Sequence, residues 1–233
     1  MKRKKLVVLT GAGMSAESGI STFRDSGGLW DKYPVEQVAT PEGFRANPEL
    51  VLNFYNVRRR ELLGTKPNAG HYGLADMEKD FDVHIITQNI DNLHEQAGSS
   101  SVIHLHGELM KSRSTGDESL IYDIDPENCD IKLGDKCEKG YQLRPHIVWF
   151  GEAVPMIEKA MKIVETADIF VVIGTSMNVY PAAGLLNYVH AGVPVYLIDP
   201  KEVNVHQPGI HFIKKGASEG VAELRDILKF QNQ

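Results

Sequence analysis

The sequence predicts an α/β protein built on a Rossmann-like, doubly wound parallel sheet with a small inserted lobe. Short runs rich in β-branched residues recur along the 233 residues and alternate with segments of helical periodicity, which is the pattern that βαβ crossovers produce. Two of the runs, DIFVVIG and HIVWFG, each contain an unbroken apolar stretch, as strands buried on both faces of a parallel sheet do. A glycine-rich turn follows the first run, where doubly wound folds bind phosphates.

The expected elements follow in chain order. Strands are expected at residues 6–10, 83–87, 102–105, 147–150, 169–173 and 195–198. Residues 30–66 interrupt this rhythm with the helical segment PELVLNFYNVRRRELL, whose Pro48 suits a first helical turn. Residues 110–145 are polar and have no sustained period. We therefore expect a sheet domain of residues 1–29, 67–109 and 146–233 and a small lobe of residues 30–66 and 110–145, with 110–145 the least ordered part.

Composition and charge exclude several classes of protein. Apolar residues make up 42% and charged residues 24% of the chain, which is ordinary for a globular protein. The net charge of −6 argues against nucleic acid as the main partner. No apolar stretch reaches the roughly 20 residues of a membrane helix, and the apolar run after MKRKK is too short for an export signal. With only 2 cysteines, we expect a protein of the reducing cytoplasm.

The first turn, GAGMSAESG, has the composition of a phosphate-binding loop. Glycines allow close backbone approach, and the amides of the following helix would face a pyrophosphate. The alternative is a tight strand-to-helix turn that binds nothing. No strand ending in an acidic residue follows about 20 residues later, as it does in dinucleotide-binding dehydrogenases, so a plain nicotinamide dehydrogenase is disfavoured.

Polar side chains follow two further strands. Gln88, Asn89 and Asp91 come directly after one run, and His106 comes after the next. Open α/β sheets bind ligands at these carboxyl ends. Alternatively, Asn89 and Asp91 close an Asx turn. Because the chain has 9 histidines, His94 and His104 compete with His106 for any catalytic role.

Longer motifs resemble one family. The segments GAGMSAESGISTFRDSGGLW at 11–30, TQNIDNLHEQAG at 87–98, HLHGEL at 104–109, VWFGE at 148–152 and GTSMNVYPAAGL at 174–185 are similar, in order and spacing, to those of the sirtuins, the NAD-dependent protein lysine deacylases. The resemblance covers nearly the whole chain. It implies that the protein consumes NAD, acts on acyl-lysine side chains of proteins, and releases nicotinamide and 2′-O-acyl-ADP-ribose.

The resemblance also implies the roles of individual residues. NAD is expected to contact the glycine turn, the loop after it and several strand ends: Gly11, Ala12, Gly13, Ala16, Glu17, Phe23, Arg24, Gln88, Asn89, Ile90, Asp91, Gly174, Thr175, Ser176, Asp199 and Ser218. Asn89 and Asp91 would orient the nicotinamide carboxamide, since an amide needs a donor and an acceptor. His106, the histidine directly before glycine, would accept the proton of a ribose hydroxyl, and Asn89 would share in catalysis. Glu108 and Asp199 depart from the residues that sirtuins commonly have there.

The substrate would bind along two loops and in one pocket. An extended acyl-lysine peptide is expected against Phe150, Gly151, Glu152, Val179 and Tyr180. Tyr55 and Arg58 resemble the Tyr-x-x-Arg pair of the sirtuin subclass that removes succinyl and malonyl groups, and Ala12 and Ala16 fit the same subclass. A guanidinium and a phenol can bind a terminal carboxylate. The alternative is that residues 58–60 form a solvated basic face and Tyr55 lies at the edge of the core.

A structural zinc is not expected. Most sirtuins hold zinc with two pairs of cysteines, but Ser112, Arg113, Ser114 and Thr115 stand where the first pair would be, and only Cys129 and Cys137 remain. Two thiolates do not complete a tetrahedral site. The lobe is then expected to pack around Leu120, Ile121, Tyr122, Ile124 and Ile131.

The leading hypothesis is a lysine deacylase that removes succinyl, malonyl and also acetyl groups. Protein mono-ADP-ribosyl transfer would use the same NAD site without needing Tyr55 and Arg58. A non-catalytic sensor of NAD or ADP-ribose is a third reading, which Asn89, Asp91 and His106 disfavour.

Overall fold

The computed structural model describes residues 3–21, 33–203 and 209–231. Within them, parallel strands form a six-stranded sheet in the order β3-β2-β1-β7-β8-β9. The strands of this sheet are β1 (Lys5–Thr10), β2 (Asp82–Thr87), β3 (Val102–His104), β7 (Ile169–Ile173), β8 (Val195–Ile198) and β9 (Ile210–Ile213). The chain winds outward from β1 to β3, returns to the centre at β7 and winds outward again. The predicted doubly wound α/β class is therefore confirmed.

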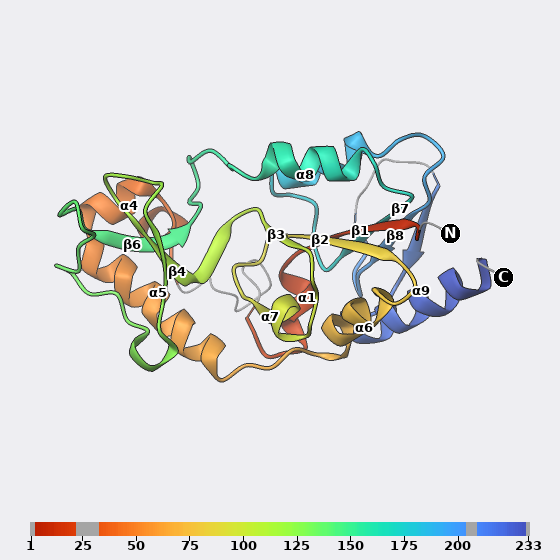
Figure 1. Ribbon diagram of the computed structural model, residues 1–233, viewed down its shortest axis with the longest axis horizontal. Helices are drawn as coiled ribbons and strands as arrows, with labels where there is room; N and C mark the ends of the chain where they lie inside the picture. Colours follow the sequence, from red (N-terminus) through yellow and green to blue (C-terminus); the bar gives the residue numbers. More distant parts are fainter. Residues whose placement is uncertain (1–2, 22–32, 204–208, 232–233) are drawn as a thin grey trace.

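Helices cover both faces of this sheet (Figure 1). One face packs against α6 (Ala69–Met77) and α9 (Ala217–Gln231), and the other against α8 (Ile157–Val164) and the 3-10 helix η2 (Ala182–Tyr188). Along β1, Leu6 and Val8 face the first pair of helices, whereas Val7 and Leu9 face the second. Because successive side chains of a strand point to opposite faces and both faces are covered, the run is apolar throughout.

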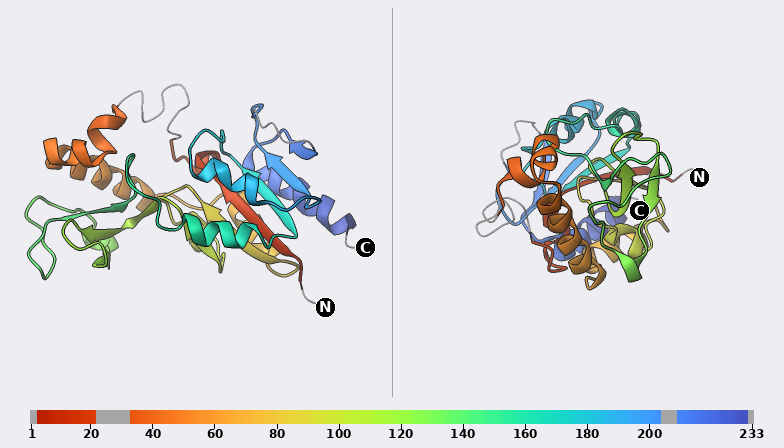
Figure 2. Two further views of the ribbon diagram at one scale, coloured as in Figure 1. Left: turned by 90° about the horizontal axis from the view of Figure 1, so that it is seen from above. Right: turned by 90° about the vertical axis from the view of Figure 1, so that its left-hand side faces the viewer.

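The other end of the elongated molecule is a small lobe (Figures 1 and 2). Its antiparallel sheet has the order β5-β4-β6, formed by β4 (Gly107–Ser114), β5 (Ile121–Asp123) and β6 (Leu143–Ile147). The helices beside it are α3 (Val35–Val38), α4 (Pro41–Ala46) and α5 (Pro48–Leu63). The expected helix α5 begins as the sequence predicts, with Pro48 in its first turn and the Asn47 side chain accepting from the Leu50 amide at 3.0 Å.

Short elements carry the connections at the centre of the molecule. α1 (Ala12–Ala16) follows β1, α7 (Leu93–Gln96) lies between β2 and β3, and the 3-10 turn η1 (Pro126–Asn128) follows β5. No helix of the described ranges is long and apolar enough to cross a membrane. The division into a sheet domain and a lobe at the boundaries given above stays a prediction.

Two expectations about the elements were wrong, and one strand was missed. The strand expected at 147–150 ends at Ile147 and pairs antiparallel with β4, because Trp149 instead enters an aromatic cluster with Phe54 and Tyr55. Residues 110–145 are not irregular throughout, since they contain β5 and most of β4 and β6. The four-residue edge strand β9 was not expected, because its alternation is too short to stand out.

The expected core of the lobe was also wrong. Of the apolar residues between 120 and 131 named for it, Ile131 is buried, whereas Ile121 is 45% exposed. The lobe packs instead around the side chains between α5 and the strand ends: Val38, Val51, Phe54, Tyr55, Leu62, Leu93, Leu109, Ile147 and Trp149.

Candidate functional site

The carboxyl ends of β1 and β7 meet where the strand order reverses, and the glycine turn lies at that point. The Gly11 amide donates to the Ile173 carbonyl at 3.0 Å, and the Gly13 amide donates to the Gly174 carbonyl at 2.8 Å. A Cβ on Gly13 would lie 2.6 Å from the Gly174 Cα. These glycines are therefore required by the contact between two turns. Open α/β sheets bind nucleotides at this switch point.

Two expected NAD-binding residues meet at the start of α9. The Glu17 carboxylate accepts from the Ser218 amide at 3.1 Å, which joins positions far apart in the sequence and satisfies an amide in the first turn of that helix. Ala12 is half-buried and Ala16 is exposed on α1. Phe23 and Arg24 lie outside the described residues.

Further expected NAD-binding residues follow β2, β7 and β8. The Thr175 hydroxyl accepts from the Gln88 side chain at 3.1 Å, so the ends of β2 and β7 are linked directly. Ser176 is exposed beside it. Asp199 follows β8, and its carboxylate accepts from the Lys201 amide at 2.8 Å. The carboxylate at this position therefore closes a turn of its own backbone.

Asn89 and Asp91 are buried and connected. The Asn89 amide group donates to the Ser15 hydroxyl at 3.1 Å, and Ser15 donates to one Asp91 oxygen at 2.9 Å. The other Asp91 oxygen accepts from the Leu93 amide at 3.1 Å, so the Asx turn that was the alternative reading is also present. Burial raises the pKa of Asp91. A buried carboxyl with a raised pKa at a strand end is typical of functional sites.

Ile90 and Glu108 have structural partners. Ile90 is half-buried, and its carbonyl accepts from the Leu109 amide at 2.8 Å, which ties the segment after β2 to β4. The Glu108 carboxylate pairs with Lys111 at 2.9 Å. The departure at position 108 is thus accommodated by a neighbour on the same strand.

The hydrogen bonds separate the three candidate histidines. His106 donates from Nδ1 to the Gln88 carbonyl at 2.9 Å, and no described residue bonds its Nε2. His104 is bonded at both nitrogens, to the Asn89 carbonyl at 3.0 Å and to Glu95 at 2.7 Å. His94 is 1% exposed and bonds to Thr10 through Nε2 at 3.1 Å.

Of the three candidates, His106 has the arrangement that a base requires. A carbonyl can only accept, so the neutral His106 carries its proton on Nδ1 and leaves Nε2 as an acceptor. Burial lowers the pKa of His106 below the ordinary value of 6.5. The side chain is therefore neutral, and able to accept a proton, at physiological pH.

Each of the two expected peptide-binding loops carries an exposed aromatic side chain. Phe150 is 44% and Tyr180 is 75% exposed, and Val179 is partly buried. Gly151 adopts φ +89°, a conformation that favours glycine. The Glu152 carboxylate is occupied within the protein, where it accepts from Arg144 at 2.6 Å, from Arg113 at 3.2 Å and from the Trp149 amide at 2.8 Å. Glu152 therefore holds this loop through its side chain.

The sequence interpretation missed Arg113 and Arg144. Both guanidinium groups are buried, and Arg144 lies over the Trp149 ring, 3.3 Å from its centroid. A sequence signal could have identified them: the two arginines stand among otherwise apolar or small residues, on either side of the lobe. Arginine is rarely buried unless it is paired, so a pair in such surroundings indicates a shared partner.

Tyr55 and Arg58 lie on α5 in different surroundings. Tyr55 is 3% exposed, and its hydroxyl accepts from the Trp149 indole at 3.0 Å. Burial raises the pKa of Tyr55. Arg58 pairs with Glu61 at 2.8 Å and lies 5.1 Å from the centroid of the Phe54 ring, while its Nη1 is buried without a partner. The reading of residues 58–60 as a solvated face is wrong for Arg59, which is fully buried.

The cysteines do not assemble a metal site. Cys129 and Cys137 are both buried and unpaired. The Cys137 thiol donates to the Ser114 hydroxyl at 3.3 Å. In the part of the chain that the structure describes, no three His, Cys, Asp or Glu side chains converge on a common point. The donors present do not fit the four-cysteine zinc site of most sirtuins, which the sequence resembles.

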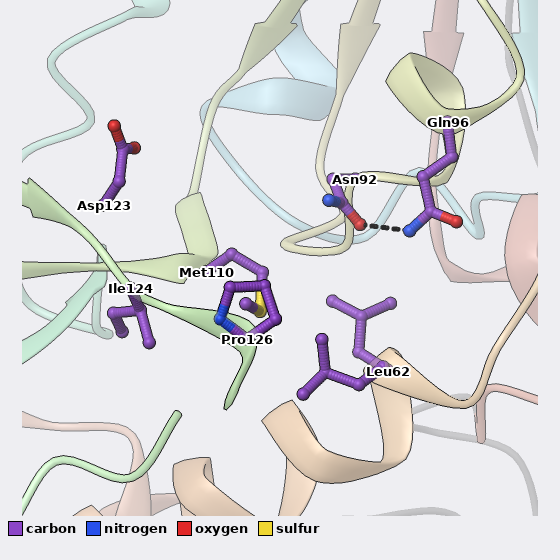
Figure 3. Close-up of a pocket in the computed structure, with 8 residues that line it drawn as sticks. Leu62, Asn92, Gln96, Met110, Asp123, Ile124 and Pro126 are labelled. Atoms are coloured by element: carbon purple, nitrogen blue, oxygen red, sulfur yellow. Dashed lines mark hydrogen bonds between the residues drawn. The ribbon is translucent and has the colours of Figure 1, made fainter. Parts of the chain in front are cut away.

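A separate cleft lies between α5, α7 and the strands of the lobe (Figure 3). It has a volume of about 380 Å³ and is lined by Leu62, Leu63, Asn92, Gln96, Met110, Asp123, Ile124 and Pro126. Its two amide side chains bond to each other at 2.7 Å. The cleft holds none of the residues with perturbed pKa values described above, so we place the chemistry at the strand ends.

Known proteins are similar to this chain over nearly its whole length. The Sir2 family profile matches residues 11–181. The chain is 66% identical over 229 residues to an NAD-dependent protein deacylase of Bacteroides thetaiotaomicron, covering 97% of this chain and 98% of that protein. It is 49% identical over 222 residues to an NAD-dependent protein deacylase of Helicobacter pylori, covering 95% and 96% of the two chains.

Solved structures agree with the sequence comparison. A Sir2 homologue in complex with NAD superposes with a TM-score of 0.85 at 40% identity, covering 97% of this chain and 91% of that one. A Sir2 protein in complex with a deacetylated peptide and 3′-O-acetyl-ADP-ribose gives a TM-score of 0.81 at 31% identity, covering 97% and 94%. With matches of this length and identity over the strand-end site and the fold that carries it, the chain belongs to the Sir2 family.

Proposed function

We propose that this NAD-dependent protein deacylase removes acidic acyl groups, succinyl and malonyl, from protein lysines in preference to acetyl groups. The enzyme class rests on the family and on relatives named NAD-dependent protein deacylase. The preference rests on one observation: on α5, Arg58 Nη1 is buried without a partner, and the neighbouring Tyr55 hydroxyl has a hydrogen that no described residue accepts.

The strand-end residues fit NAD. Asn89 offers an amide and Asp91 a carboxyl group, both buried at the end of β2, and together they can satisfy the donor and acceptor of a carboxamide. When bound, NAD supplies the ribose that accepts the acyl group and the nicotinamide that leaves. Gln88 and Thr175 link the strand ends on either side of the glycine turn, and we assign them to the ribose and phosphate portion.

His106 would act on the ribose hydroxyl. Its Nδ1–H is held by the Gln88 carbonyl, so the ring is oriented and the acceptor nitrogen Nε2 is fixed in position. Because burial keeps the imidazole neutral, Nε2 can take the hydroxyl proton without first losing one of its own.

Arg58 and Tyr55 would distinguish an acidic acyl group from an acetyl group. Arg58 shares its charge with Glu61 at the helix surface, but its buried Nη1 still lacks an acceptor. An acyl carboxylate would satisfy that donor and the Tyr55 hydroxyl together, whereas an acetyl methyl would leave both unsatisfied. The difference would appear as selectivity for acidic acyl chains.

The proposal is tested with matched acyl-lysine peptides. The double variant Tyr55→Phe with Arg58→Met should lower kcat/KM for a succinyl peptide by about tenfold or more, and for the acetyl peptide by much less, because a charge-assisted bond is lost only with the acidic group. Arg60→Met is the matched control, since Arg60 lies on the same helix and pairs with Asp130. An equal fall for both peptides would mean that the pair supports the helix and does not read the acyl group.

We further propose that the lobe binds no zinc and that the protein works in the cytoplasm. Two buried thiols supply too few ligands for zinc, and unpaired cysteines are typical of a reducing compartment. Elemental analysis of the dialysed protein tests the first point. One zinc per chain that is lost in a Cys129→Ser variant would contradict it.

A further inference from the structure

Two histidines at and just after the end of β3 bond to the carbonyls of two consecutive residues that follow β2. His106 donates to the carbonyl of Gln88, and His104 donates to the carbonyl of Asn89. His106 has a nitrogen left over, but His104 uses its second nitrogen to bind Glu95 on α7. His104 therefore cannot be a base at the ribose, and its two bonds need another explanation.

We propose that His104 and Glu95 form a positioning dyad that fixes the main chain of Asn89 and so preorganises the side chains that bind the nicotinamide end of NAD. This inference rests on the proposed function. It assigns a role to two residues that touch neither substrate nor cofactor.

The dyad is an ion pair between a buried histidine and a partly exposed carboxylate. The His104 side chain is 7% exposed and lies 2.7 Å from a Glu95 oxygen. Because Nδ1 must donate to a carbonyl, Nε2 carries a proton when it faces the carboxylate. Burial alone would lower the pKa of His104, but the hydrogen bond and charge of Glu95 outweigh it and the pKa is raised. The pKa of Glu95 is lowered by the same pairing, against the opposing effect of burial.

Other charged groups around His104 favour the same state or oppose it weakly. Glu108 on β4 and Asp91 after β2 both attract a charged His104. His94 on α7 is neutral, since burial lowers its pKa well below the ordinary value. The imidazolium of His104 is thus surrounded by more negative than positive groups.

Asn89 is held at three points, and His104 supplies one of them. Its amide donates to the Thr87 hydroxyl at 3.0 Å, its carbonyl accepts from His104 at 3.0 Å, and its side chain donates to Ser15 at 3.1 Å. Ser15 in turn donates to Asp91. A shift of the Asn89 main chain would therefore move both groups that are expected to contact the carboxamide.

The chain contains a matched pair that lacks this connection. His84 lies 3.2 Å from Asp82 and bonds to the Ser101 hydroxyl at 2.9 Å. This second histidine–carboxylate pair also links β2 to a residue just before β3. It lies toward the amino end of β2, whereas His104 bonds to a residue after the carboxyl end of β2. Removing it should affect stability without affecting the nicotinamide end of the site.

The test measures binding of NAD and of ADP-ribose, which lacks nicotinamide, by calorimetry on the full-length protein. In His104→Leu, NAD should bind about tenfold more weakly, the loss of one charge-assisted bond, while ADP-ribose affinity stays within about twofold. His104→Asn, whose amide can still donate to the Asn89 carbonyl, should recover most of the NAD affinity. Glu95→Gln, altered at a partly exposed side chain, should show a smaller loss in the same direction. His84→Leu should leave both affinities unchanged.

Several results would overturn the dyad. These are equal losses for NAD and ADP-ribose, no loss in His104→Leu, a loss in His84→Leu as large as in His104→Leu, or a His104→Asn variant no better than His104→Leu. The thermal midpoint of each variant shows whether it is partly unfolded. Partial unfolding would lower the fraction of protein that binds NAD but would leave the dissociation constant unchanged. If wild-type protein binds NAD but turns over no acyl peptide, the proposed function fails while the binding comparison still decides the dyad.

Discussion

His106 shows how one hydrogen bond can decide a side chain's chemistry. Three histidines compete for the catalytic role in the sequence, and in the structure they differ in burial and in what their ring nitrogens contact. His104 is bonded at both nitrogens, and His94 is 1% exposed, so its partnerless Nδ1 is shut away from any ligand. The half-buried His106 leaves Nε2 as an acceptor that no described residue binds. Of the three, His106 is therefore the residue that we propose as the base.

The pH dependence of turnover tests this state of His106. A base must be neutral, so activity is lost as pH falls through its pKa, and burial places that pKa below 6.5. We expect the acid limb of kcat/KM for NAD to lie below pH 6.5, and His106→Ala to abolish turnover while NAD still binds. The profile is measured with an acyl peptide at saturating concentration. An acid limb above that pH, or substantial turnover by His106→Ala, would exclude this role.

At the scale of elements, one buried cation, Arg59, clamps α5 to the other elements of the lobe. Arg59 is fully buried and donates to the Leu109 carbonyl at 2.8 Å, to the Cys129 carbonyl at 2.6 Å and to Asn56 at 2.8 Å. Asn56 also exchanges hydrogen bonds with both main-chain groups of Ile131. Burial lowers the pKa of Arg59 to about 10, so the group remains charged at neutral pH. The helix, β4 and the segment that carries Cys129 are thereby joined through one side chain.

The clamp predicts a large and local cost of mutation. Arg59→Met should lower the free energy of unfolding by about 2–4 kcal/mol, because buried carbonyls lose their donor. The neighbouring Arg60→Met should cost less than about 1 kcal/mol, since Arg60 forms a partly exposed ion pair with Asp130. Urea unfolding of the two variants gives the comparison. Similar losses in both would show that Arg59 does not carry the connection.

For the whole molecule, buried neutral histidines should make the fold sensitive to acid. Burial lowers the pKa of His71 from 6.5 to about 4, and the unfolded chain keeps the ordinary value. Unfolding therefore takes up a proton between these pH values, so stability falls as pH drops from 6.5 toward 4. A difference of this size corresponds to about 3 kcal/mol at most.

This sensitivity can be measured with one substitution. The His71 ring accepts from the Asn68 amide at 3.2 Å in a capping box, and glutamine can replace it there. His71→Gln should therefore lose less stability than the wild type between pH 7 and 4 in thermal unfolding. Equal losses in the two proteins would assign the acid sensitivity to other groups.

The parts of the molecule that the sequence predicts are those set by local patterns. β1, β2, β7 and β8 were predicted because strands covered on both faces must be continuously apolar. The strands of the lobe were not, because they bury Arg113 and Arg144, which is favourable only once Glu152 is beside them. Local sequence patterns do not show such tertiary partners, so the sequence predicts residues 110–145 to be irregular.

The candidate site divides in the same way. Positions such as Asn89, Asp91 and His106 follow strand ends, and the topology brings them to one edge. The sequence did not show that Glu17 accepts from Ser218, or that Glu152 pairs with two arginines. Both contacts join residues that are distant in the sequence or lie on different elements. Residue types indicate the chemistry, whereas the partners decide whether a group is free to perform it.

The most direct test of the proposed activity follows all three products of one reaction. A succinyl-lysine peptide is incubated with the protein and NAD, and mass spectrometry and chromatography quantify free lysine peptide, nicotinamide and acyl-ADP-ribose. We predict one nicotinamide and one acyl-ADP-ribose for each succinyl group removed, with no reaction when NAD is omitted or when His106→Ala is used. Loss of the acyl group without NAD, or release of nicotinamide with ADP-ribose attached to protein and the acyl group intact, would contradict the assignment of this chain as a lysine deacylase.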